Sequence, residues 1–219
     1  MHDKTAQISR LSRCAVVPVV TIPSVASAVP LAEALLKGGL DVIEVTLRSD
    51  CALEAISEIV RSGLGICVGA GTILTPKDVD AAQMAGAEFL VSPGMTSRLV
   101  APLREFEGLV LPGISTVSEA LCRLEEGFTV QKLFPAELSG GAAFLQAIGA
   151  PVPGIRFMPT GGVHLGNLPA YLALPNVVAA GGSWLAPADL VVTGQFAEIT
   201  RRALEATELV TRIRSGANE

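Results

Sequence analysis

A lysine and a glutamate stand out because each interrupts a segment that otherwise has the pattern of a buried β-strand. Lys132 lies in "TVQKLFPAE", residues 129–137, and Glu44 lies in "DVIEVTLR", residues 41–48. Buried parallel strands are normally runs of Val, Ile and Leu, and a buried charge is costly unless something compensates it. An amine in an apolar cavity can act as a nucleophile, and a nearby carboxylate can move protons. The two residues therefore indicate nucleophilic catalysis.

The alternation of side chains predicts that both residues face the same interior. In residues 41–48 the apolar set belongs against helices, which points Glu44 and Thr46 inward and leaves Arg48 at the rim. In residues 129–134 the same argument turns Lys132 inward and Gln131 outward, although the pattern does not explain an outward amide. A structural ion pair is the alternative, but such pairs roughly break even against hydrophobic replacements. Position therefore favours catalysis.

The elements that position these residues are predicted to be strands and helices that alternate along the whole chain. Eight apolar runs are each followed by a helical pattern: Cys14–Val20, Asp41–Leu47, Gly65–Ala70, Glu88–Ser92, Leu109–Pro112, Thr129–Phe134, Ile155–Pro159 and Val177–Gly181. Strict alternation predicts parallel strands, and eight units predict a single (β/α)8 barrel. An open doubly wound sheet is the competitor, but no G-x-G-x-x-G follows the first run. We expect a capping helix in 1–13, the barrel in 14–214 and a frayed tail in 215–219.

Helix boundaries carry signals of their own. Thr75-Pro76 and the sequence "TVSE" from Thr116 are typical helix starts, and the second is a capping box. Glycines at Gly38-Gly39, Gly63 and Gly86 predict helix ends.

Other strand ends supply the rest of a candidate site, because barrel enzymes bind substrates at the carboxyl ends of their strands. Thr72 follows the third strand and Pro93 the fourth, although each signal is weak alone. Thr160 with Gly161-Gly162 follows the seventh strand, and Gly181-Gly182-Ser183 follows the eighth. Two glycine loops at these strands favour a phosphate site built from backbone N–H groups.

Composition excludes several classes of function. The 219 residues carry a net charge of −5 with an isoelectric point near 5.1, and the basic residues are scattered, which argues against nucleic acid. Only two histidines occur, so a metal site is not expected. No apolar stretch approaches the about 18 residues of a membrane helix. The leader-like start is interrupted by Pro18 and Pro23, which indicates a cytoplasmic protein. Four dispersed cysteines are expected to be buried thiols.

The motifs taken together resemble one family. "EVTLR", "GAGTIL", "VSPG", "LPGIST", "KLFPAE", "MPTGGV" and "AAGGSW" occur in the order and spacing of the 2-keto-3-deoxy-6-phosphogluconate (KDPG) and 4-hydroxy-2-oxoglutarate (KHG) aldolases. The resemblance covers residues from about Cys14 to Ala186, and "EVTLR" with "K-x-F-P-A-E" carries most of its specificity. It implies a homotrimeric (β/α)8 barrel without a metal cofactor, acting on a phosphorylated keto acid.

The resemblance also implies roles for individual residues. Lys132 forms the Schiff base, and Glu44 is the general acid and base. The pyruvate end of the substrate is bound by Arg48, Thr72, Pro93 and Phe134, and the distal phosphate end by Thr160, Gly161, Gly162, Gly182 and Ser183. The alternatives are an aldolase for the galactonate epimer and a barrel that binds a phosphorylated metabolite without reacting with it.

Overall fold

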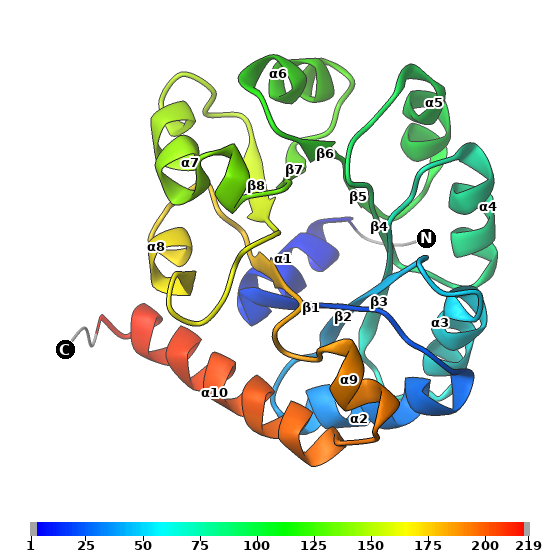
Figure 1. Ribbon diagram of the computed structural model, residues 1–219. Coiled ribbons are helices and arrows are strands. Elements are labelled where there is room, and N and C mark those ends of the chain that lie inside the picture. Colours follow the sequence, from blue (N-terminus) through cyan, green and yellow to red (C-terminus); the bar gives the residue numbers. More distant parts are fainter. Residues whose placement is uncertain (1–3, 217–219) are drawn as a thin grey trace.

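The computed structural model describes residues 4–216 and shows parallel strands enclosed by helices (Figure 1). The strands are β1 (Val16–Val20), β2 (Val42–Thr46), β3 (Cys67–Gly71), β4 (Phe89–Val91), β5 (Leu109–Leu111), β6 (Gly113–Ile114), β7 (Val130–Leu133), β8 (Arg156–Pro159) and β9 (Ala180–Gly182). The α-helices are α1 (Lys4–Cys14), α2 (Ala28–Lys37), α3 (Ala52–Arg61), α4 (Pro76–Met84), α5 (Ser97–Glu105), α6 (Val117–Glu125), α7 (Gly141–Gly149), α8 (Leu168–Leu172), α9 (Ala188–Val192) and α10 (Phe196–Arg214). Short 3-10 helices cover Val25–Ser27 (η1) and Glu137–Ser139 (η2).

The strands form two parallel ladders. Six strands pair in the order β5-β4-β3-β2-β1-β9, and three pair in the order β6-β7-β8. Bridges between Phe157 and Val177 and between Thr160 and Gly181 bring β8 beside β9. The predicted α/β class with parallel strands is confirmed, and its sheet is curled with helices around the outside (Figure 1).

The fifth predicted strand differs from expectation because it is broken at Pro112. Proline has no N–H to contribute to a ladder, so β5 ends at Leu111 and β6 begins at Gly113. The carbonyl of Pro112 still accepts a hydrogen bond from Lys132 N at 2.9 Å. A Cβ at Gly113 would lie 2.2 Å from the backbone of Pro93, so glycine permits the loop after β4 to pass closely. The segment therefore pairs with β4 before Pro112 and with β7 after it.

Helix α1 lies across the amino-terminal ends of the strands. Gln7 is buried, and its amide joins Glu88 O to Leu109 N with hydrogen bonds of 2.5 and 2.7 Å. Arg10 donates to Asp41 Oδ2 at 3.0 Å and to Gly65 O at 2.5 Å. These partners precede or begin four different strands, so α1 holds the strand starts together. The predicted tail, 215–219, lies mostly outside the described residues.

The expected helix boundaries are largely confirmed. Thr75 and Thr116 both form capping boxes, with Asp78 and Glu119 returning hydrogen bonds to the backbone. Among the predicted helix ends, Gly39, Gly63 and Gly86 have positive φ.

An apolar cluster fills the space between the strands at their amino-terminal ends. Its buried members include Leu11 from α1, Val17, Val42, Phe89 and Met158. Phe89 needs Gly69 beside it, because a Cβ there would lie 2.2 Å from the ring. Gly69 therefore makes room for core packing and not for substrate. Because this apolar cluster fills the amino-terminal ends of the strands, a site is expected at their carboxyl ends.

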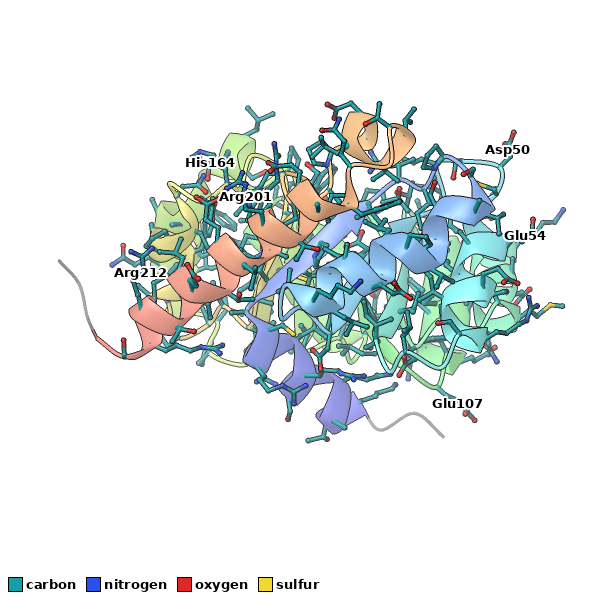
Figure 2. All side chains as sticks on the ribbon, turned by 90° about the horizontal axis from the view of Figure 1, so that it is seen from below. Asp50, Glu54, Glu107, His164, Arg201 and Arg212 are labelled. Carbon is teal, nitrogen blue, oxygen red and sulfur yellow. The ribbon has the colours of Figure 1, made fainter. Side chains whose placement is uncertain are left out.

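The surface carries the charges. Arg201 and Arg212 on α10 extend outward, as do Asp50, Glu54 and Glu107 (Figure 2). None of the described helices is long and apolar enough to cross a membrane.

The expectation for the four cysteines is wrong for one of them. Cys14 and Cys67 are buried and Cys51 is half-buried, but Cys122 is exposed on α6. All four are free thiols. The helical face of Cys122 turns toward solvent, whereas Ala120 on the same helix is buried.

Candidate active site

Lys132 and Glu44 meet inside the molecule, as the alternation of β7 and β2 predicts. Lys132 Nζ lies 3.4 Å from Glu44 Oε1, and their side chains are 6% and 0% exposed. Lys132 Nζ also lies 5.1 Å from the centroid of the Phe134 ring. A buried ion pair contributes little net stability, because the cost of removing both charges from water offsets their attraction. A chemical role therefore explains the presence of Lys132 and Glu44 better than a structural one.

The carboxylate of Glu44 is confined by the neighbouring strand. Gly71 of β3 lies opposite, and a Cβ at that position would be 2.2 Å from Glu44 Oε1. The other oxygen, Oε2, is buried and has no hydrogen-bond partner among the described residues. A buried unpaired carboxylate oxygen is costly, and such exceptions call for an explanation. Glu44 is therefore held in one place with one oxygen still free to accept a proton.

A cavity of about 180 Å³ opens above the pair at the carboxyl ends of the strands. Its lining combines acidic, basic, hydroxyl and glycine residues from seven strand ends. The lining residues are Val19, Glu44, Thr46, Arg48, Thr72, Pro93, Lys132, Phe134, Thr160, Gly161, Gly162, Val163, Gly181 and Ser183. Every site residue predicted from the sequence except Gly182 is among them.

One end of the cavity is formed after β2 and β3. Arg48 is at the exposed rim, and its Nε donates to Thr46 Oγ1 at 3.1 Å. Thr72 has φ of +64°, which is unusual for a β-branched residue and costs about 1–3 kcal/mol. Strain of this kind persists where the surroundings impose it, and it is concentrated at functional sites. Arg48 and Thr72 together present a cation and a hydroxyl to the cavity.

The other end follows β8 and β9 and carries neutral donors. Thr160 Oγ1 is buried without a partner among the described residues, and Gly181 makes room for it, since a Cβ would lie 2.3 Å away. Gly161 and Gly162 have φ of +98° and +81°, a conformation that glycine adopts without penalty. Ser183 is exposed at the mouth. This end offers hydroxyl groups and backbone N–H groups to an anion.

Gly182 has a different environment from the one predicted. It is buried in β9 and does not line the cavity, whereas its neighbour Gly181 does. The six-membered ring of Trp184 occupies the space where a Cβ would stand, with contacts as short as 1.6 Å if one were added. Gly182 therefore serves the packing of the loop that carries Ser183.

A hydrogen-bonded chain from buried Tyr171 through exposed Glu137 supports the Gly161-Gly162 turn. Glu137 N donates to Gly161 O at 3.1 Å, and the Tyr171 hydroxyl donates to Glu137 Oε1. Burial, and then the bond to the Glu137 carboxylate, raises the pKa of Tyr171 above its ordinary value. Tyr171 thus stays a hydrogen-bond donor well into the alkaline range.

The outward amide of Gln131, unexplained from the sequence, has partners in the structure. Its Nε2 donates to Ala120 O and Phe128 O, both at 3.0 Å, which links β7 to α6 and the loop that follows. Gln131 thus anchors the strand on one face while its neighbour Lys132 faces the cavity on the other. Sequence reasoning missed Val19 and Val163 as lining residues, because small apolar residues carry no chemical signal.

The described residues contain no group of three His, Cys, Asp or Glu side chains arranged to hold a metal ion. The cavity itself supplies an amine, a carboxylate, a guanidinium and hydroxyl groups.

Comparisons with known proteins agree on one family. Residues 8–202 match the family model described as KDPG and KHG aldolase. A relative from Escherichia coli K12, named KHG/KDPG aldolase, is 45% identical over 94% of this chain and 96% of its own length. A relative from Treponema pallidum, named 2-dehydro-3-deoxy-phosphogluconate aldolase, is 44% identical over 91% of this chain and 95% of its own.

A solved structure matches as well. The KDPG aldolase of Legionella pneumophila, captured with pyruvate as a covalent carbinolamine, has a TM-score of 0.88 and 37% identity over 91% of this chain and 97% of its own.

Proposed function

The chain belongs to the KDPG and KHG aldolase family, and we propose that it cleaves 2-dehydro-3-deoxy-6-phosphogluconate to pyruvate and D-glyceraldehyde 3-phosphate through a Schiff base on Lys132. The observation that carries the proposal is the buried contact of Lys132 Nζ with Glu44 Oε1 at the base of the cavity. Activity toward 4-hydroxy-2-oxoglutarate is part of the same proposal, since the family includes both activities.

The first step is attack of the amine on the C2 ketone. The amine must be neutral to attack, and Glu44 Oε1, 3.4 Å from Nζ, is placed to accept its proton. Glu44 returns this proton to the hydroxyl of the resulting carbinolamine, which leaves as water and gives a protonated imine, and Glu44 is again a carboxylate. The positive nitrogen of the imine draws electrons from the neighbouring bonds. The cavity's Phe134 ring stabilises positive charge at this nitrogen through its π face.

Bond cleavage then uses the same carboxylate as a base. Glu44 takes the proton of the C4 hydroxyl, the C3–C4 bond breaks, and its electron pair enters the imine to form an enamine while the aldehyde leaves. The enamine takes a proton at C3 from the carboxylic acid, and water releases pyruvate from Lys132. General acid–base help of this kind contributes roughly 10²–10⁴-fold to a rate.

Substrate orientation follows from the two unlike ends of the cavity. The cation of Arg48 and the hydroxyl of Thr72 suit the carboxylate next to the ketone, and Pro93 lines that end. Thr160, Gly161, Gly162 and Ser183 suit the distal phosphate through neutral donors. Gly182 does not line the cavity but packs against Trp184, which supports the loop that carries Ser183.

The wider architecture belongs to the proposal too. We propose that the two ladders close into one (β/α)8 barrel, which is supported by the bridges between β8 and β9 and by the continuous chain across Pro112. We also propose a cytoplasmic location and, from the family resemblance, a homotrimer. Gel filtration with light scattering measures the oligomer directly.

Trapping with borohydride tests the proposal. The protein is incubated with pyruvate and sodium borohydride, and the reduced adduct is located by peptide mass spectrometry. An adduct on Lys132 is expected, with none in Lys132→Met and an unchanged yield in the exposed-site control Lys77→Met. Absence of an adduct on Lys132 in the unaltered protein would refute the proposal and favour a barrel that only binds its ligand.

Turnover on the two epimers separates the remaining alternative. The gluconate epimer is expected to react faster, since relatives named for it are 44–45% identical, whereas a solved structure named KDPGal is 28% identical. A faster reaction with the galactonate epimer would assign the chain to the other activity.

A further inference from the structure

Thr46 is a buried hydroxyl of the cavity that has no role in the mechanism above. Its side chain is 1% exposed, and it lies at the end of β2 two residues before Arg48. Thr46 Oγ1 donates to Val20 O at 2.9 Å, lies 2.9 Å from Thr21 Oγ1, and receives Arg48 Nε–H at 3.1 Å. One oxygen atom thus joins β1, the loop after β1 and the cation of the site.

The hydrogen-bonding capacity of this oxygen is fully used. A hydroxyl has one proton to donate and two lone pairs to accept. Its proton goes to Val20 O, so in the contact with Thr21 the Thr21 hydroxyl is the donor. The second lone pair faces Arg48 Nε. The bond that Thr46 donates to Val20 O and the bond that it accepts from Thr21 therefore aim its remaining lone pair at the arginine.

The consequence for Arg48 is a restriction of its guanidinium. Arginine has five N–H donors in a planar fork, and one of them, on Nε, is occupied by Thr46. The two terminal nitrogens remain available to bind a carboxylate with two parallel hydrogen bonds. An exposed arginine without such a contact loses rotamer freedom when it binds, which weakens binding.

We propose that Thr46 is a positioning residue, which holds Arg48 so that its two terminal nitrogens bind the carboxylate of a 2-oxo acid end-on. The inference rests on the proposed function and deepens it, because it assigns the geometry by which the carboxylate is recognised. Thr46 itself does not touch the substrate in this arrangement. It acts through Arg48.

A purely structural role for Thr46 would lead to a different experimental result. The bond to Val20 O ties β2 to β1, and its loss alone would lower stability without changing affinity for a carboxylate. Affinity for pyruvate therefore separates the two roles, because pyruvate carries the carboxylate and ketone but no distal phosphate.

The experiment measures the pyruvate concentration that gives half-maximal borohydride trapping on Lys132. In Thr46→Val, which keeps the shape and removes the hydroxyl, this concentration is expected to rise about tenfold, the usual effect of losing a hydrogen bond to a charged group. Trapping at saturating pyruvate is expected to stay complete. Thr46→Ser keeps the hydroxyl and is expected to remain within about twofold of the unaltered protein.

A double-mutant cycle with Arg48→Gln tests whether Thr46 acts through Arg48. In the Arg48→Gln background, Thr46→Val is expected to cause no further rise in the half-maximal pyruvate concentration. Thr200→Val, which removes a 3.0 Å hydroxyl bond to Ala34 O far from the cavity, controls for general destabilisation and is expected to leave that concentration unchanged.

Three results would overturn the inference: an unchanged half-maximal concentration in Thr46→Val, an equal rise in the Arg48→Gln background, or an equal rise in Thr46→Ser. If Thr46→Val does not fold, Thr46→Cys, a poor acceptor of similar shape, replaces it with the same expected tenfold rise. If the unaltered protein forms no adduct, the proposed function fails, and that result is distinct because it does not depend on any variant.

Discussion

Gly71 is the position at which a single methyl group should displace Glu44, the proposed acid and base, while leaving Lys132, the proposed nucleophile, in place. In Gly71→Ala the new Cβ would lie 2.2 Å from Glu44 Oε1 and 2.8 Å from its Cδ and Cγ. Ordinary van der Waals contact begins near 3.4 Å, so the oxygen must move by about 1.2 Å. Glu44 is 0% exposed and lines the cavity, so the cavity is the space into which its carboxylate can move.

The expected effect is a loss of turnover. Misplacing a reacting group by about 1 Å typically costs about 100-fold, within the range of roughly 10²–10⁴ for general acid–base catalysis. We therefore expect kcat to fall about 100-fold in Gly71→Ala, measured as pyruvate release coupled to lactate dehydrogenase. Lys132 is untouched, so borohydride trapping of pyruvate at saturation should be retained, as it should in part for Glu44→Gln.

A matched control is Gly154→Ala. Gly154 has a negative φ, and its added Cβ would meet only Leu124 at 3.7 and 3.8 Å, which is ordinary contact. Its kcat should equal that of the unaltered protein. If Gly71→Ala keeps kcat within about threefold while remaining folded, the position of Glu44 does not govern the rate, and the role assigned to this carboxylate is refuted.

Three further predictions concern groups outside the reacting pair. Burial acts to raise the pKa of Asp41, but hydrogen bonds from Cys14, Arg10 and Arg13 outweigh it and hold that pKa below its ordinary value. Asp41→Asn should therefore lower the free energy of unfolding by about 1 kcal/mol near neutral pH. This difference from the unaltered protein should be present above about pH 4 and should vanish as the pH falls through the lowered pKa of Asp41. Urea unfolding across this pH range measures the difference, and a difference that does not change with pH contradicts the prediction. Exposed Cys122 should react with iodoacetamide in the native protein. Cys14 and Cys67 should react only on unfolding, because burial shields them and raises their pKa values to about 11 and about 12. Peptide mass mapping identifies the labelled cysteines, and labelling of Cys14 or Cys67 in the native protein contradicts the prediction. Tyr171 is the chain's single tyrosine, and burial and the Glu137 carboxylate raise its pKa. Phenolate absorbance in an alkaline titration of the folded protein should therefore appear only well above pH 10. A titration midpoint near pH 10 contradicts the prediction.

The buried pair of Lys132 and Glu44 could be predicted from the sequence because the alternation of strand side chains is a strong constraint. Shifting a strand by one residue reverses every side chain, so placing the apolar neighbours of Glu44 against helices left one orientation for the carboxylate. The lysine followed by the same argument, and the cavity contains both. The carboxyl ends of the strands were the expected location because parallel strands present them at one edge.

The parts that could not be predicted depend on contacts between distant segments. Gln131 looked misplaced because its partners, the carbonyls of Ala120 and Phe128, come from another element. Gly69 and Gly71 looked equivalent in sequence, yet Gly69 accommodates the ring of Phe89 and Gly71 accommodates the carboxylate of Glu44. No local pattern contains that difference. The exposure of Cys122 depends on the rotation of α6 against the strands, which its short apolar segment did not fix.

The order of the lining residues along the chain has a consequence for how such a protein can change. Most of the groups proposed to react with or bind the keto acid end lie between Glu44 and Phe134, and the distal end is formed by residues 160–183. A gene segment covering residues 156–183 can thus be exchanged or randomised without altering the codons of the proposed nucleophile, Lys132, or the proposed base, Glu44. Selection on substrate length and charge can act on this segment separately, so the arrangement favours the divergence of new substrate preferences around a constant reaction.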